Sequence, residues 1–188
     1  MTGETPSQTV GPFFALGLTA EQYEYPHSSI AGPDLTTPDT EGTRITVTGQ
    51  VFDGNGEPVT DAMIELWQAD AAGRYPGQGS NTGFKSFGRA GTGSDDTASF
   101  SFQTIRPGSI GDNHAAHINV ALFMRGTLNH LFTRIYFPED TPDHTRDPVL
   151  LAVPPDRRAT LIASLEAANV YRFDIHMQGA QETVFFDI

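Results

Sequence analysis

The strongest constraint on the fold is an alternation of apolar and polar residues that begins at residue 43. In the segment 44–53, "RITVTGQVFD", isoleucine and valine alternate with threonine and glutamine, as in a strand with one buried face. Six further segments are rich in β-branched and aromatic residues and predict strands: 61–70, 98–104, 116–124, 131–137, 170–177 and 182–188. Seven strands separated by turn signals such as "DGNGEP" predict an all-β fold, a β-sandwich.

One segment has helical periodicity instead. In "PPDRRATLIASLEAAN" Leu161, Ile162, Leu165 and Ala168 would share one face of a helix. Pro155 suits a first helical turn, and an acidic residue follows it. We therefore expect one helix in the C-terminal half, from Pro155 to about Ala168. Because helices and strands do not alternate along the chain, a parallel α/β fold is excluded.

The first 42 residues lack a strand pattern and contain five prolines. A segment this long without regular structure is unusual in a compact domain. Its apolar stretch "VGPFFALGL", 10–18, is too hydrophobic for a free tail, so we expect it to dock. The expected organisation is an N-terminal arm over residues 1–42, packed on a partner chain, and a sandwich domain over residues 43–188.

Composition excludes several classes of protein. The chain has 188 residues, no cysteine and a net charge of −12, so disulfides, thiolate metal sites and a basic nucleic-acid-binding face are not expected. No apolar run approaches the roughly 18 residues of a membrane span, and the N-terminus lacks the pattern of a signal peptide. The sequence thus predicts a soluble, cytoplasmic protein.

His117 and Asn119 lie two residues apart in the expected strand 116–124. Their side chains would face the same side, about 7 Å apart, a spacing at which two histidines can bind one metal ion. The second position is Asn, whose neutral amide oxygen is a weak donor to ferric iron. The pattern is that of a metal site lacking one ligand, or of a strand with an ordinary polar face.

Two further side chains are candidates for a site. Tyr75 lies in the glycine-rich segment 73–93, where it could bind a metal through its phenol or simply pack. That segment has no GxGxxG or P-loop spacing, so it does not predict nucleotide binding. Arg134 lies between two aromatic residues on one strand face. It could bind a carboxylate, stack on a ring, or pair with an acid such as Glu65.

Several segments together resemble the intradiol ring-cleavage dioxygenases, in particular the members that act on protocatechuate. The most specific are "TPSQTVGPFF" and "ETVFFDI", and the intervening segments are "GQVFDGNGEPVTDAMIELWQAD", "SFGRAGTG", "AHINVALFMRG", "RIYF" and "YRFDIHMQG". The resemblance runs from about Thr5 to the C-terminus. It implies a β-sandwich of two mixed sheets, with the N-terminal arm packed against a partner chain.

The resemblance also implies an activity and a partner. Related α and β chains pair in this group and form higher multimers, and the β chain holds Fe(III) with two Tyr and two His. The catechol substrate, 3,4-dihydroxybenzoate, binds the iron through both oxygens and reacts with O₂. Its ring opens between the two hydroxyl-bearing carbons, giving 3-carboxy-cis,cis-muconate. On this reading the present chain is an α chain, and Fe(III) is held by the β chain rather than by this chain.

The resemblance leaves the iron-binding pattern incomplete in this chain. Tyr75 matches one Tyr ligand, and the His-x-His pair falls on His117 and Asn119, so one imidazole is missing. The second Tyr is expected after "RPG", where Ser109 and Ile110 stand instead. We therefore interpret Tyr75, His117 and Asn119 as vestigial iron-site positions, with no metal and no catalytic residue in this chain alone.

What remains for this chain, by the resemblance, is part of the wall of the partner's substrate pocket. The matching positions are Thr9, Gly11, Pro12, Phe13 and Arg134. Two alternatives stay open at this point. One is a self-sufficient intradiol dioxygenase that uses His114, His117 and Tyr75 as ligands. The other is a β-sandwich binding or carrier module without enzymatic activity, since one fold hosts many functions.

Overall fold

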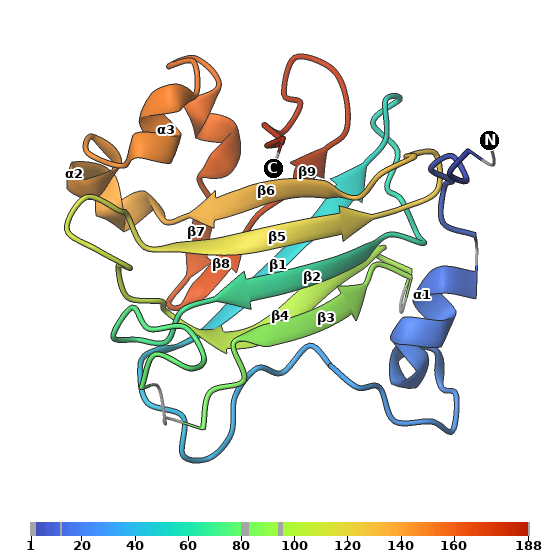
Figure 1. Ribbon diagram of the computed structural model, residues 1–188, viewed down its shortest axis with the longest axis horizontal. Helices are drawn as coiled ribbons and strands as arrows, with labels where there is room; N and C mark the ends of the chain where they lie inside the picture. The colour runs from blue at the N-terminus through green and yellow to red at the C-terminus, as the bar shows by residue number, and fades with distance from the viewer. Residues whose placement is uncertain (1–2, 12, 80–82, 94–95, 188) are drawn as a thin grey trace.

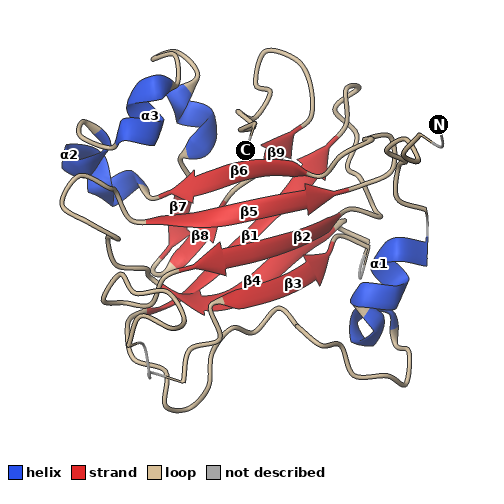
Figure 2. Ribbon diagram, viewed as in Figure 1, coloured by secondary structure: helices blue, strands red, loops and turns tan. Residues whose placement is uncertain are grey.

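Two β-sheets lie face to face in the computed structural model, which describes residues 3–11, 13–79, 83–93 and 96–187 (Figures 1 and 2). The first is a mixed sheet, in which β1 pairs in parallel with β8 and β9 and all other pairs are antiparallel. Its path runs β4 (Ser99–Ile105), β1 (Arg44–Phe52), β8 (Val170–Arg172) and β7 (Ser164–Ala167), with β9 (Ile175–His176) beside β1.

The second sheet is antiparallel throughout. Its order is β3 (Phe87–Gly91), β2 (Met63–Gln68), β5 (His117–Phe123) and β6 (Leu131–Tyr136). The predicted all-β sandwich is therefore confirmed, with one mixed sheet where the resemblance implied two. The alternation read from the sequence decides which face is buried: Ile118, Val120 and Leu122 of β5 point into the core between the sheets. His117 and Asn119 alternate with them and lie on the outer face.

Short helices lie at the two ends of the strands, as Figure 2 shows. Near one end is α1 (Phe13–Leu18), which is followed by the 3-10 helix η1 (Ala20–Tyr23). At the other end are α2 and α3, and a small second core lies there, made of Ala115, Tyr136, Leu150, Val153 and Leu161. The helical elements of this end are η2 (Pro138–Asp140), α2 (Thr141–His144), α3 (Pro148–Ala152) and η3 (Arg158–Leu161). None of the helices in the described ranges is long and apolar enough to cross a membrane.

The expected helix from Pro155 to about Ala168 is wrong. The segment forms η3, whose Leu161 is fully buried in the second core, and then the edge strand β7. A turn at Asn169, with φ of 62°, pairs β7 antiparallel with β8, and the Asn169 carbonyl accepts a hydrogen bond from Thr46 of β1. Tertiary pairing thus overrides the helical periodicity, and Leu165, expected on a buried face, is about half exposed.

Other strand boundaries also differ from expectation. The strand β3 lies in the glycine-rich segment that was not expected to contain one, and the expected strand 170–177 is divided into β8 and β9. The segment 182–187 contributes only an isolated bridge, between Phe186 and Phe132 of β6. These segments carry the right residues for pairing, but which neighbour they meet depends on the topology of the whole sandwich.

Part of the N-terminal region closes an edge of this chain's own sandwich. The Leu35 amide donates to the Gln103 carbonyl of β4 at 2.9 Å, and the Arg89 amide of β3 donates to the Gly32 carbonyl at 3.1 Å. The Gln22 side chain donates to and accepts from the backbone of Gly91, at 2.6 and 2.7 Å. Residues 22–35 therefore join the edges of the two sheets.

Candidate functional site

The vestigial positions and Arg134 lie on the outer face of the antiparallel sheet, where β5 and β6 pair. The register places Asn119 opposite Arg134 and His117 opposite Tyr136. Opposite residues on one face of an antiparallel pair have Cβ atoms about 4.5–5.5 Å apart, so their side chains meet. Sheet register, rather than any local sequence signal, brings these four groups together.

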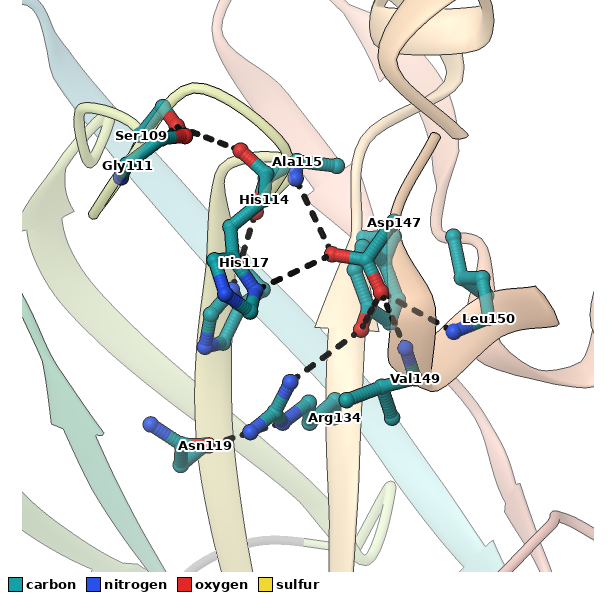
Figure 3. A network of polar contacts seen from close by, with 11 residues as sticks. Ser109, Gly111, His114, Ala115, His117, Asn119, Arg134, Asp147, Val149 and Leu150 are labelled. Atoms are coloured by element: carbon teal, nitrogen blue, oxygen red, sulfur yellow. Dashed lines mark hydrogen bonds and ion pairs between the residues drawn. The ribbon is translucent and has the colours of Figure 1, made fainter. Parts of the chain in front are cut away.

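A continuous line of hydrogen bonds connects five side chains, which we call the polar network: Tyr75, Asn119, Arg134, Tyr136 and Asp147. Arg134 donates through Nε to Asn119 Oδ1 at 3.1 Å and through Nη1 to Tyr136 Oη at 3.4 Å. Asn119 donates through Nδ2 to Tyr75 Oη at 3.0 Å, and Tyr136 donates to Asp147 Oδ1 at 3.2 Å. Figure 3 shows the Arg134 guanidinium directed toward the Asn119 side chain.

Asp147 anchors one end of the polar network. Its carboxylate is fully buried and caps α3 by accepting from the amides of Val149 and Leu150, both at 2.9 Å. A third amide, that of Ala115 before β5, donates to Oδ2 at 3.0 Å (Figure 3). Bonds from several backbone N–H groups hold a carboxylate in one orientation.

His117 is buried beside this network without joining it. Its Nδ1 lies 2.9 Å from the Ala115 carbonyl oxygen, so Nδ1 carries the proton and Nε2 has a free lone pair. Nε2 is buried and has no hydrogen-bond partner in the part of the chain that is described. Burial lowers the pKa of His117 to about 4, so the ring is neutral at neutral pH.

The phenols at the site stay protonated. Burial raises the pKa of Tyr75, whose ring stacks on Trp67 with centroids 5.5 Å apart. Burial also raises the pKa of Tyr136 to about 12. The Arg134 charge opposes both shifts without reversing them. Neither hydroxyl is therefore poised to become a phenolate near neutral pH.

These residues do not fit ferric iron. Fe(III) favours anionic oxygen donors and several imidazoles, whereas Tyr75 is a protonated phenol, Asn119 a neutral amide and His117 a single imidazole. The Arg134 guanidinium is bonded to Asn119 and its charge lowers the pKa of His117, so it would repel a metal cation at this place. Among the described residues, no three His, Asp or Glu side chains are grouped as a metal site.

The position at which the resemblance places the second Tyr ligand has no phenol. Ser109, where the second Tyr was expected, donates to the carbonyls of Gly111 and His114, and Ile110 is partly exposed. His114 lies in the loop before β5, with Nδ1 3.9 Å from Asp147 Oδ2. The three ligands of the self-sufficient alternative thus belong to different local environments: His114 beside Asp147, His117 beside Ala115, and Tyr75 bonded to Asn119.

The five predicted pocket residues are divided between two places. Arg134 lines a pocket of about 590 Å³ on the outer face of the antiparallel sheet, and none of the described arm residues lines that pocket. Thr9 Oγ1 accepts a hydrogen bond from the Gly126 amide at 3.0 Å, and Gly11 and Phe13 are exposed. Pro12 lies outside the described residues. Within one chain, the structure does not bring the arm to Arg134.

Glu65 does not pair with Arg134, although the sequence left that open. Its Oε1 accepts from Arg89 at 2.9 Å and 2.5 Å, in a pair between adjacent strands β2 and β3. Sequence reasoning also missed Asp147 as the anchor of the site. The signal was present, because Asp followed by Pro is typical of a helix N-terminus, with the Asp as cap and the Pro at the first position.

Comparison with known proteins places the chain in a family. A family model described as "Dioxygenase" matches residues 20–179. The chain is 48% identical to the protocatechuate 3,4-dioxygenase alpha chain of Burkholderia cepacia, over 98% of both chains. It is 35% identical to the beta chain of that enzyme from the same organism, over 76% of this chain and 67% of the beta chain.

The fold comparison agrees. The dioxygenase domain of a dioxygenase carbohydrate-binding protein fusion from Streptomyces sp. SirexAA-E matches with a TM-score of 0.59 and 26% identity. That match covers 94% of this chain and all of the other. The chain therefore belongs to the intradiol ring-cleavage dioxygenases, a family that depends on iron.

Proposed function

We propose that this chain is the α chain of a protocatechuate 3,4-dioxygenase, and that the β chain of the same enzyme holds the Fe(III). The near-complete match to a protocatechuate 3,4-dioxygenase alpha chain supports the substrate class. The reaction is intradiol cleavage of 3,4-dihydroxybenzoate by O₂, in which both oxygen atoms enter the product, 3-carboxy-cis,cis-muconate.

One observation supports the proposal that the β chain, and not this chain, holds the iron. Where the family pattern requires a second imidazole, this chain has Asn119, which is committed to Arg134 and Tyr75 by hydrogen bonds. The Arg134 guanidinium thus lies beside Asn119, at a position where the family pattern has a ligand of Fe(III). The chemistry must then come from a companion chain, and this chain contributes structure to the complex.

The N-terminal arm is the part of this chain that we assign to the partner. Residues 3–11 are almost all exposed, and the Phe13 side chain is 77% exposed in the isolated chain. A large aromatic side chain left in water is typical of a surface that another protein covers. We therefore assign Thr9, Gly11, Pro12 and Phe13 to the wall of the β chain's substrate pocket, in an assembly that multimerises further.

Co-expression with the β chain tests this proposal. We expect the full chain purified alone to contain little iron and to show no consumption of O₂ with protocatechuate, whereas the α/β complex contains iron and is active. Stoichiometric iron in the chain alone, with a visible tyrosinate-to-iron absorption band, would support the self-sufficient alternative. Failure of the two chains to copurify would favour the binding-module alternative.

A single substitution sharpens the test. Asn119→His restores the His-x-His pair on β5 without removing Arg134 or restoring the second Tyr. We expect this variant of the chain alone to remain without iron, because the guanidinium and the missing phenolate still oppose binding. Stoichiometric iron uptake by Asn119→His would show that a single imidazole was the only deficit.

A further inference from the structure

Two contacts within this chain flank the arm residues that we assign to the partner's pocket. On one side, the Gly126 amide donates to Thr9 Oγ1 at 3.0 Å. On the other side, the rings of Phe14 and Phe123 lie with their centroids 5.6 Å apart. Gly126 and Phe123 both belong to the end of the hairpin that β5 and β6 form, and the N-terminal segment lies beside that end in Figure 1. One element therefore holds the stretch between Thr9 and Phe14 at both of its ends.

The second contact is coupled to the backbone of the arm. The Phe14 amide donates to the Gly11 carbonyl at 3.1 Å, so the position of Phe14 determines that of Gly11. Adjacent side chains of a helix point about 100° apart, and in α1 the Phe14 ring meets the hairpin while Phe13 is 77% exposed. The contact of Phe14 with the hairpin therefore also determines where the Phe13 ring is presented.

The end of the hairpin, residues 123–130, has a fixed backbone. Phe123 is the last residue of β5 and pairs with Met63 of β2. Beyond it, Thr127 Oγ1 donates to the Met124 carbonyl at 2.9 Å, across the turn that contains Gly126. Gly126 has φ of 90°, a conformation that side chains disfavour, so a glycine is needed where the amide is directed at Thr9.

Side-chain interactions tie the same hairpin end to the strands on either side of β5. Arg125 Nε forms an ion pair with Asp61 Oδ2, in the turn before β2. The His130 ring stacks on Phe123 with centroids 5.3 Å apart and meets Phe132 of β6 edge-on at 4.6 Å. The hairpin end is thus a support whose position is set by the sandwich.

Packing leaves the arm only partly fixed on this support. A hollow of about 190 Å³ lies between the arm and the hairpin end, lined by Val10 and Phe14 on one side and by Met124 and Leu128 on the other. Residues 3–9 are exposed, so the Thr9 hydrogen bond competes with water in the isolated chain. Under a partner chain the same bond would be shielded from water and would become stronger.

We propose that the hairpin end is a positioning element of the dioxygenase. It holds Thr9 and Phe14, and it thereby sets where Gly11 and Phe13 enter the wall of the β chain's substrate pocket. Gly126 and Phe123 are positioning residues that act through the arm. This inference rests on the proposed function and extends it to residues that the resemblance did not assign. Because the arm belongs to the pocket wall and not to the iron site, a misplaced arm should raise KM for protocatechuate while kcat changes little.

The isolated chain tests whether the hairpin holds the arm. The chain has no cysteine, so Ser7→Cys gives a single attachment point for a nitroxide label in the exposed arm. We expect the electron paramagnetic resonance spectrum to contain a motionally restricted component. Phe123→Ala and Thr9→Val should each reduce that component about two-fold or more, because each removes one of the two contacts. Thr9→Ser keeps the hydroxyl and should retain the wild-type spectrum.

Kinetics of the purified α/β complex test what this position is for. Phe123→Ala, at a residue outside the assigned pocket wall, should raise KM for protocatechuate roughly 3- to 10-fold with kcat and iron content near wild type. Thr9→Val should raise KM similarly and Thr9→Ser should restore it, a comparison that holds even if Phe123→Ala folds poorly.

The ion pair of the hairpin supplies a weaker variant with a matched control. Arg125→Gln should raise KM by less than Phe123→Ala does, because the Arg125 side chain is 58% exposed. Arg146→Gln, at an arginine whose side chain is also 58% exposed but which lies outside the hairpin, should leave KM unchanged.

Unchanged label mobility in both Phe123→Ala and Thr9→Val would overturn the inference. So would an unchanged KM in complexes whose arm has become mobile, because the β chain alone would then place the arm. A fall in kcat at constant KM would also contradict it. An inactive wild-type complex would remove the proposed function and this inference together, whereas an active complex with indifferent variants would remove this inference alone.

Discussion

The polar network and the N-terminal arm both contain residues that the sequence analysis singled out, but the two regions are held in place differently. The polar network is fixed by this chain alone: Asp147 is fully buried and accepts bonds from three amides and a phenol. The arm before η1 rests on the Thr9–Gly126 hydrogen bond and a ring contact between Phe14 and Phe123. One region is therefore held by contacts within the chain, and the other is the region that we propose an assembly stabilises.

The largest expected effect on this comparison comes from Asp147→Ala. It removes the cap of α3 and leaves the Ala115 amide and the Tyr136 hydroxyl without their acceptor. We expect a loss of about 3 kcal/mol or more in the free energy of unfolding, measured by urea denaturation. Asp143→Ala, at an exposed aspartate paired with Arg146, is the control and should cost less than about 0.5 kcal/mol. Equal losses of unfolding free energy in the two variants would show that Asp147 does not anchor the polar network.

Acidification should destabilise the chain through His117. Its pKa is about 4 in the folded chain and about 6.5 when unfolded, so the unfolded state binds the proton first as pH falls. The stability contribution is fully present above pH 6.5 and is lost progressively down to about pH 4. The difference corresponds to roughly 3 kcal/mol.

Denaturation of wild type and His117→Phe between pH 7 and pH 4 measures this contribution. The variant should lose less stability over that range than the wild type, because it has no buried imidazole to protonate. Parallel curves for the two proteins would mean that His117 is already solvated in the folded state.

Asn119→Ala should have an intermediate effect. It removes the acceptor of Arg134 Nε and the donor to Tyr75, and we expect a loss of about 1–2 kcal/mol in the free energy of unfolding. Asn129→Ala is the control, at an exposed asparagine near the arm residues, and it should change the free energy of unfolding little. A loss no larger than that control would show that the centre of the polar network is loose in solution.

The smallest effect on the isolated chain is expected in the arm. Phe13→Ala should change the free energy of unfolding by less than about 0.5 kcal/mol, because its side chain is already exposed. In the α/β complex the same variant should reduce turnover of protocatechuate roughly 10-fold. That reduction corresponds to the loss of about 1.4 kcal/mol of contact between Phe13 and the substrate pocket. A large loss of stability with unchanged turnover would reverse the comparison between the two regions.

The sandwich could be predicted from the sequence because its signal is local. A strand alternates every two residues, so the buried face of β1 or β5 is visible within one segment. For the site, the sequence predicted only that iron ligands are missing, because Asn119 and Ser109 stand at positions where ligands were expected. Its actual contacts could not, because Tyr75, Asn119, Arg134 and Asp147 are far apart in sequence.

The sequence by itself determined which residues face the core, which donor types stand at the family's ligand positions, and that His117 lacks a second imidazole on its strand. Tertiary structure decided that the segment 155–168 forms the short 3-10 helix η3 and the edge strand β7 instead of one α-helix. It also decided that Arg134 donates hydrogen bonds to Asn119 and Tyr136. The physical reason is that side-chain alternation is a property of a single strand, whereas register and pairing follow from the packing of the whole sandwich.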